Sequence, residues 1–173
     1  MNVLPAFKHI KAFILDVDGV LTDGTLLVLD DGQMARKMNI KDGFALQLAI
    51  KMGYHILIIS GGYSDAVVMR LKKLGIEEVN MNVTDKKNIL GVFLAKHGLK
   101  AEEVLYMGDD IPDMPAMKMA GLPCCPADAV AEIRQAAHYI SPFNGGYGCV
   151  RDVIEKVLKL NGHWNFDETI QSK

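Results

Sequence analysis

The feature of this 173-residue chain that most restricts its fold is a series of short apolar runs separated by helix-like patterns. The clearest runs are Lys11–Val17, Tyr54–Ser60, Glu103–Gly108 and Leu122–Cys125. Their apolar residues are largely consecutive and do not alternate with polar ones, so both faces of each strand must be covered. The intervening helices supply that cover. The sequence therefore predicts an α/β fold with a doubly wound parallel sheet.

Weaker segments complete this prediction. Two further short strands are expected at Glu78–Met81 and Tyr139–Ile140. The expected helices are Gly43–Met52, Ser64–Leu74, Asp85–His97, Pro112–Ala120, Ala129–Ala136 and Cys149–Leu160. Glycine directly follows several of them, which is typical of helix C-termini.

One insertion interrupts the alternation of strands and helices. Thr25–Leu29 and Gln33–Asn39 flank the turn sequence Asp-Asp-Gly at residues 30–32. This pattern predicts a β-hairpin, placed at about residues 22–39, directly after the first strand.

Length and charge limit the domains and the partners of the chain. The length predicts one domain over residues 1–162, without a cap domain, and a C-terminal tail over residues 163–173. The 19 basic and 21 acidic residues give a net charge of −2, whereas nucleic-acid binding needs a basic face. No apolar run is long enough for a membrane span and no signal-peptide pattern is present, so we expect a cytoplasmic protein.

Acidic residues gather where two of the strands end, and ligands of open parallel sheets lie beyond these carboxyl ends. The first strand ends in DVDGV at residues 16–20, and carboxylates so close together are costly unless a cation neutralises them. A later strand ends in GDDIPD at residues 108–113, which by composition suits a hard cation. The alternative is a surface turn and a helix cap, a role that suits Asp110 or Asp113.

Two further groups lie on the same predicted rim. Ser60 ends the second strand, and the N–H groups of Gly61 and Gly62 can approach a phosphate closely, although Ser-Gly-Gly is also an ordinary turn. Lys86 follows Asp85 in the first turn of a helix, where acidic residues are favoured over basic ones. The lysine is either a solvated residue of that turn or a cation kept for another use. Chance poorly explains the ordered set of acid pair, hydroxyl, lysine and acid cluster.

Taken in order, these residues resemble the four motifs of the haloacid dehalogenase-like (HAD) phosphohydrolase superfamily. The matching motifs are DVDGV at 16–20, Ser60, Lys86 and GDDIPD at 108–113. The whole chain, through GGYGCVR at 145–151, is similar to the small capless branch of that superfamily. This branch includes phosphatases of 3-deoxy-D-manno-octulosonate 8-phosphate (KDO 8-phosphate) and of related nonulosonate 9-phosphates. The resemblance implies a HAD-like Rossmannoid core.

The resemblance also implies a Mg²⁺-dependent phosphatase that forms an aspartyl-phosphate. Asp16 would be the nucleophile and Asp18 the general acid and base. Asp16, the backbone carbonyl of Asp18, and Asp109 would hold Mg²⁺, while Lys86 would offset negative charge. The substrate would be a sugar-acid phosphate, either KDO 8-phosphate or, as the alternative, a nonulosonate 9-phosphate.

Other residues receive supporting roles from the same resemblance. Ser60 and Gly61 would bind phosphoryl oxygens. Asp110 and Asp113 would support the metal ligands without binding the metal themselves, Asp113 by holding a metal-bound water or by orienting Lys86.

One departure from the family pattern concerns the sugar acid. Many relatives carry a basic residue just after the Ser/Thr-Gly pair, where this chain has Gly62. The substrate carboxylate would then need Lys41, Arg70 or a cation of a neighbouring subunit such as Arg151. The candidate residues for binding the sugar acid are Lys41, Asp42, Gly43 and Arg70.

A capless site needs another cover to shield it from water. In the family the hairpin packs within a tetramer, and a neighbour's residues close the site. The predicted hairpin carries the apolar residues Leu26, Leu27, Leu29, Met34 and Met38, which an interface explains better than solvent does. We therefore expect a homotetramer.

Three other classes of protein fit parts of the pattern. A response-regulator receiver domain shares the fold class, but its phospho-acceptor ends the third strand. A noncatalytic HAD-like regulatory or assembly module would be expected to lack catalytic residues that are all present here. A phosphotransferase would pass the phosphoryl group to an acceptor other than water.

Overall fold

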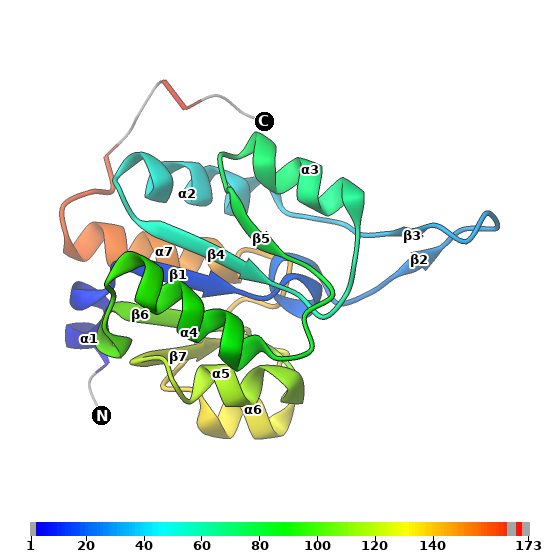
Figure 1. The fold of residues 1–173 in the computed structure, drawn as a ribbon. Coiled ribbons are helices and arrows are strands. Elements are labelled where there is room, and N and C mark those ends of the chain that lie inside the picture. Colours follow the sequence, from blue (N-terminus) through cyan, green and yellow to red (C-terminus); the bar gives the residue numbers. More distant parts are fainter. Residues whose placement is uncertain (1–2, 166–168, 171–173) are drawn as a thin grey trace.

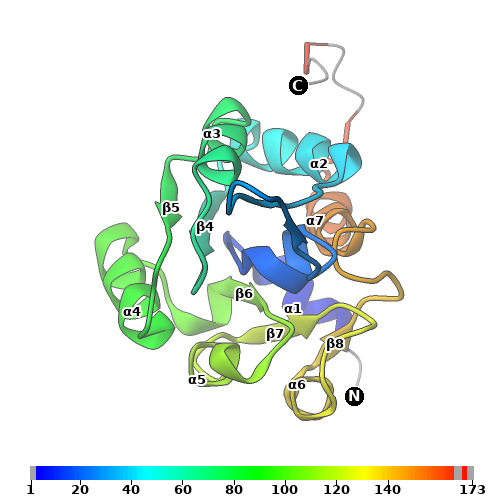
Figure 2. The same cartoon turned by 90° about the vertical axis from the view of Figure 1, so that its right-hand side faces the viewer.

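The protein is described by a computed structural model that covers residues 3–165, 169 and 170. Its centre is a six-stranded sheet in the order β5-β4-β1-β6-β7-β8, in which every neighbouring pair is parallel. The strands are β1 (Ala12–Leu15), β4 (His55–Ile59), β5 (Glu78–Asn80), β6 (Val104–Met107), β7 (Leu122–Cys125) and β8 (Tyr139–Ile140). Helices cover both faces of the sheet (Figures 1 and 2), which confirms the predicted doubly wound fold.

The side chains of β1 show how the two helical layers are held. Phe13 and Leu15 are buried in one core cluster, and Ala12 and Ile14 are buried in the other. The first cluster contains residues of α1 (Leu4–His9), α2 (Ile40–Lys51), α3 (Asp65–Lys73) and α7 (Cys149–Leu160). The second contains residues of α4 (Lys86–His97), α5 (Met114–Met117) and α6 (Ala131–Ala136). Successive side chains of a strand point to opposite faces, so one apolar strand anchors both layers.

Several element boundaries differ from the prediction. Helix α2 begins three residues before the predicted Gly43, because the side chain of Asn39 accepts a hydrogen bond from the Lys41 N–H and caps the helix. Helix α5 begins two residues later than predicted, because a single 3₁₀ turn at Ile111–Asp113 precedes it, and it ends at Met117, three residues before the predicted end. Helix α1 was not predicted.

The predicted hairpin is confirmed. Strands β2 (Leu27–Val28) and β3 (Met34–Ala35) pair in antiparallel fashion, and the hairpin projects from the body of the molecule (Figure 1). Strand β2 is solvent-accessible, with Leu27 and Val28 each 65% exposed. Within the ranges that the structure describes, no cap domain covers the sheet, and none of the helices combines the length and the apolar character that a membrane span requires.

The first part of the predicted tail packs against its own chain. The ring of Trp164 meets Phe44 edge to face, with the centroids 6.1 Å apart, and the Arg151 guanidinium lies 5.3 Å from the Trp164 centroid. Residues 166–168 and 171–173 of the predicted tail lie outside the described residues.

The segment before α7 packs tightly against the acidic turn that follows β1. The Gly146 N–H donates to the Val20 carbonyl at 2.9 Å. A Cβ on Gly145 would lie 1.9 Å from the carbonyl oxygen of Gly19. This close approach of two backbones fixes the position of the turn that carries the first two aspartates.

The Gly145 contact predicts a loss of stability on substitution. In Gly145→Ala the methyl group meets backbone atoms that cannot move aside, and we expect a loss of about 1–3 kcal/mol, or about 3–10 °C in Tm. Gly91→Ala is the matched control, because Gly91 lies inside α4 with no heavy atom within 4 Å of the added Cβ. It should gain about 0.5–1 kcal/mol. Thermal unfolding with equal Tm for both variants would contradict this packing argument.

Candidate active site

Asp16 lies at the carboxyl end of the central strand β1. Its N–H donates to the Met107 carbonyl of β6 at 3.1 Å, and its Oδ1 accepts from the Val17 N–H at 2.7 Å. The chain then enters a kinked helical turn at Val17–Leu21 that contains Asp18. Both predicted carboxylates therefore lie at the carboxyl end of a central strand of the sheet.

One glycine in each acidic motif leaves room for a carboxylate of the second motif. Gly19 has a φ of +85°, and a Cβ there would lie 1.9 Å from Asp109 Oδ2. A Cβ on Gly108 would lie 2.4 Å from Asp113 Cγ. Neither position accommodates a side chain without moving a carboxylate, which explains why glycine belongs to both motifs.

The ammonium group of Lys86 forms ion pairs with a carboxylate of each acidic motif. Its Nζ lies 3.0 Å from Asp16 Oδ2 and 2.8 Å from Asp113 Oδ1, and its side chain is only 6% exposed. Asp113 also accepts hydrogen bonds from the Tyr106 hydroxyl at 2.7 Å and from the Asp109 N–H at 3.2 Å. Asp113 is thus in direct contact with Lys86, and Tyr106, which the sequence did not indicate, shares the same carboxylate oxygen.

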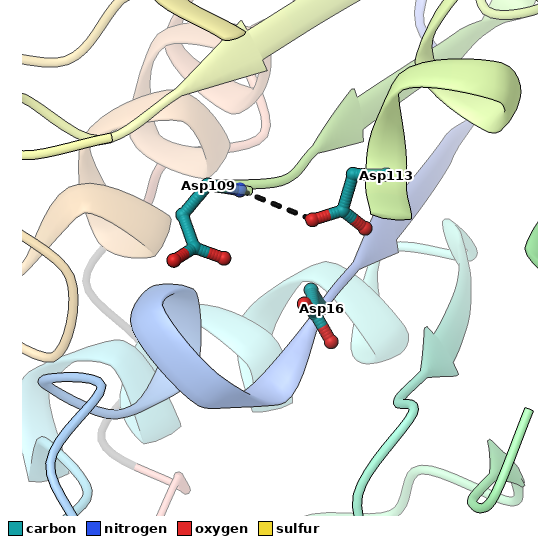
Figure 3. Close-up of side chains that lie close together, drawn as sticks. All are labelled: Asp16, Asp109 and Asp113. Atoms are coloured by element: carbon teal, nitrogen blue, oxygen red, sulfur yellow. Dashed lines mark hydrogen bonds between the residues drawn. The ribbon is translucent and has the colours of Figure 1, made fainter. Parts of the chain in front are cut away.

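The carboxylates of Asp16, Asp109 and Asp113 form a group that fits a divalent cation (Figure 3). One oxygen from each lies within 4.8 Å of the others. Asp109 Oδ1 is buried and has no hydrogen-bond partner among the described residues, whereas both oxygens of Asp113 accept hydrogen bonds. Hard cations such as Mg²⁺ bind such oxygens. Asp16 and Asp109 are thus better placed than Asp113 to supply ligands.

Burial and crowding raise the affinity of this group for protons. Burial raises the pKa of Asp16 to about 8, with Asp113 adding to the effect and Lys86 opposing it. Burial, with Asp113 and Asp110, raises the pKa of Asp109 to about 7. For Lys86, burial alone would lower the pKa, but Asp16 and Asp113 hold it above its ordinary value. Without a metal ion, Asp16 and Asp109 therefore bind protons at a higher pH than an ordinary aspartate does.

Ser60 and the two glycines after it line the same cavity as the aspartates. Ser60 is buried at the end of β4, and its Oγ accepts from the Gly62 N–H at 3.2 Å. This cavity has a volume of about 300 Å³. It is lined by Asp16, Asp18, Gly24, Ser60, Gly61, Gly62, Val83, Thr84, Lys86, Asp109, Asp110, Pro112 and Asp113. The structure thus brings the acid pair, the hydroxyl, the lysine and the acid cluster together at one cavity.

Asp18 has a partner that the sequence did not indicate. Arg36 Nε donates to Asp18 Oδ1 at 2.6 Å, and Arg36 Nη2 donates to Asp18 Oδ2 at 3.2 Å. Arg36 follows β3 and reaches back from the hairpin into the site. Asp110, by contrast, is exposed, and its side chain accepts a hydrogen bond from the Ile111 N–H as a helix cap does.

The residues suggested for the sugar acid do not all meet. Arg70 lines a second cavity of about 780 Å³ next to the hairpin. Gly43 leaves room for it, since a Cβ there would lie 3.0 Å from Arg70 Nη2. Lys41 is exposed in the first turn of α2 and does not line either cavity.

Asp42 and Arg151 lie at the contact between α2 and α7. Asp42 is 1% exposed and accepts a hydrogen bond from the Arg151 N–H at 2.7 Å, and burial raises its pKa to about 6. The Arg151 guanidinium lies near the rings of Phe44 and Trp164 and pairs with Glu155 at 3.2 Å. In this structure both residues serve helix packing.

The chain belongs to the family of haloacid dehalogenase-like hydrolases, whose sequence profile matches residues 63–154. This confirms the resemblance seen in the motifs and excludes a receiver domain. Within the family, the chain is 32% identical over 161 residues to 3-deoxy-D-manno-octulosonate 8-phosphate phosphatase KdsC of Escherichia coli K12. The match covers 93% of this chain and 86% of that relative.

Solved structures agree with this membership. The 3-deoxy-D-manno-octulosonate 8-phosphate phosphatase of Yersinia pestis superposes with a TM-score of 0.91 at 31% identity, covering 93% of this chain and 87% of the other. The enzyme of the same name from Moraxella catarrhalis, in complex with magnesium, phosphate and KDO, gives a TM-score of 0.88 at 34% identity, covering 91% of each chain.

The raised pKa values predict that metal binding releases protons. Mg²⁺ must displace the protons held by Asp16 and Asp109, so its affinity should increase as the pH rises from about 6 to 8. Calorimetric titrations at pH 7 in buffers of different ionisation enthalpy should show release of about one proton per ion.

Two aspartate variants test the assignment of the ligands. Asp109→Asn should weaken Mg²⁺ binding strongly, whereas Asp110→Asn, which changes the exposed cap, should bind nearly as well as the unchanged chain. An affinity for Mg²⁺ that is independent of pH would show that these carboxyl groups do not bind the metal.

Proposed function

We propose that the protein is a Mg²⁺-dependent phosphatase that hydrolyses the phosphomonoester of a sugar acid, namely KDO 8-phosphate, to KDO and phosphate. The observation that carries this proposal is the contact of Lys86 with Asp16 at 3.0 Å beside the free oxygen of Asp109. The KdsC relatives support the choice of substrate, since the chain matches them over 93% of its length.

The main obstacle to the reaction is electrostatic. At ~4 Å and an effective dielectric constant near 20, each repulsion between unit charges costs ~4 kcal/mol, and a phosphate dianion must approach the Asp16 carboxylate. Lys86 offsets part of this repulsion from a buried position. Mg²⁺ held by Asp16, Asp109 and the Asp18 carbonyl would supply the rest by drawing charge from the phosphoryl oxygens.

The residues of the chain then account for both halves of the reaction. A carboxylate oxygen of Asp16 forms a bond to phosphorus as the bond from phosphorus to the sugar oxygen breaks, and Asp18 gives its proton to the leaving oxygen. In the second half, water attacks the aspartyl-phosphate, Asp18 takes a proton from it, and phosphate and free Asp16 are regenerated. Ser60 and Gly61 hold the phosphoryl oxygens throughout.

A neighbouring subunit is the proposed cover of the site. The described residues contain no cap, and the projecting hairpin exposes Leu26, Leu27, Val28 and Met34. We propose a homotetramer in which these hairpins pack together and shield the cavity. Sedimentation that showed only monomers, while activity persisted, would contradict this cover.

Phosphate release tests the function. With Mg²⁺, the protein should release phosphate from KDO 8-phosphate much faster than from a nine-carbon nonulosonate 9-phosphate, and a chelator should abolish both reactions. Asp16→Asn should lower kcat by at least about a thousandfold, because the amide is a poor nucleophile.

Each alternative has its own outcome in this assay. A faster reaction with the nonulosonate 9-phosphate would reassign the substrate. Slow release that an added alcohol or sugar acceptor accelerates would indicate a phosphotransferase. A complete lack of Mg²⁺-dependent turnover with every phosphomonoester would favour the noncatalytic module.

A further inference from the structure

The ion pair between Arg36 and Asp18 lies where the hairpin meets the active site. The Arg36 side chain is 6% exposed although it comes from a projecting hairpin, and the Asp18 side chain is 35% exposed. Both carboxylate oxygens of Asp18 accept from this one guanidinium. Such bidentate pairing is the strongest geometry available to arginine and a carboxylate.

The pair occupies space that a glycine leaves open. A Cβ on Gly62 would lie 2.9 Å from Asp18 Oδ2 and 3.2 Å from Arg36 Nη2. A side chain at this position and the ion pair cannot both be present without a shift. In this chain the cation next to position 62 is therefore Arg36, which comes from the hairpin.

The pair also separates two cavities. Asp18 lines the cavity of about 300 Å³ that holds the acidic group and Ser60, and Arg36 lines the neighbouring cavity of about 780 Å³ that also holds Arg70. A substrate whose phosphate lies beside Asp16 and whose other end extends toward the hairpin must pass Arg36. The group that suits this position is a second carboxylate.

This arrangement conflicts with the role of Asp18 as a proton donor. Both carboxylate oxygens of Asp18 accept hydrogen bonds from the Arg36 guanidinium, so neither can contact the leaving oxygen while the pair is closed. The pair must therefore open before the leaving oxygen can be protonated.

We propose that Arg36 is the residue that recognises the substrate's carboxylate, and that its transfer from Asp18 to that carboxylate opens the ion pair and leaves the Asp18 side chain free to contact the leaving oxygen. This inference rests on the proposed phosphatase function. Exchanging one carboxylate partner for another keeps the guanidinium paired, whereas a neutral sugar phosphate offers no such exchange and leaves Asp18 bound. Selection for sugar acids is thereby linked to catalysis.

The test compares KDO 8-phosphate with a neutral hexose 6-phosphate, which lacks the carboxylate but has a leaving oxygen that also needs a proton. In Arg36→Gln, kcat/KM for KDO 8-phosphate should fall about 10- to 100-fold, the value of a charge-assisted hydrogen-bond pair. For the hexose phosphate it should stay the same or rise, because Asp18 is released. The ratio of the two values should thus collapse.

Three further variants keep the test decisive. Lys37→Gln removes the same charge one residue away, where Lys37 pairs with Asp23 at 2.9 Å, and should leave the ratio unchanged. Arg36→Lys should restore part of it. Gly62→Ala should fold normally, because its methyl group meets only the ends of Asp18 and Arg36 within 3.5 Å, and should also lower the ratio.

The outcomes separate the two proposals. Equal losses with both substrates, or an unchanged ratio in Arg36→Gln and Gly62→Ala, would overturn the role of Arg36. If the unchanged protein hydrolyses the hexose phosphate but not KDO 8-phosphate, the proposed substrate is wrong, whatever the variants do.

Discussion

Repulsion between carboxylates at the edge of the sheet is the constraint on which the active site depends. Asp16, Asp109 and Asp113 converge in a space where burial raises the pKa of the first to about 8 and of the second to about 7. Lys86 is the buried cation that makes this convergence tolerable, since it contacts both Asp16 and Asp113. A divalent cation would replace the protons on Asp16 and Asp109. The same charge repulsion that destabilises the metal-free site therefore favours metal binding.

Glycines decide how closely the charged groups approach one another. At Gly19 and Gly108 a side chain would collide with Asp109 or Asp113, and at Gly62 it would meet Asp18 and Arg36. The three positions belong to three different strand ends, which the parallel sheet places side by side. Because these positions have no side chains, the charged groups have room to converge at the cavity. This requirement for glycine is apparent only when the neighbouring segments are in place.

The order of strands and helices was predictable because consecutive apolar residues require cover on both faces, and Phe13 and Ile14 supply each face with an anchor. The convergence of Asp16, Ser60, Lys86 and Asp109 was predictable too, since parallel strands end at one edge. Lys41 illustrates the limit of this reasoning. Similarity to a family segment predicted that Lys41 contacts the sugar acid. In this structure the helix begins at Ile40 and Lys41 is exposed and lines neither cavity, so that contact stays a prediction.

The sequence by itself determined the sheet, the hairpin and the charged groups at the strand ends, because hydrophobic pattern and strand direction act locally or along one edge. Only the tertiary structure decided which groups pair. Arg36 reaches Asp18 across 18 residues, and the Tyr106 hydroxyl finds Asp113 inside the core. Such contacts depend on the path of a hairpin and on the space beside a glycine, and no periodicity in the chain encodes either.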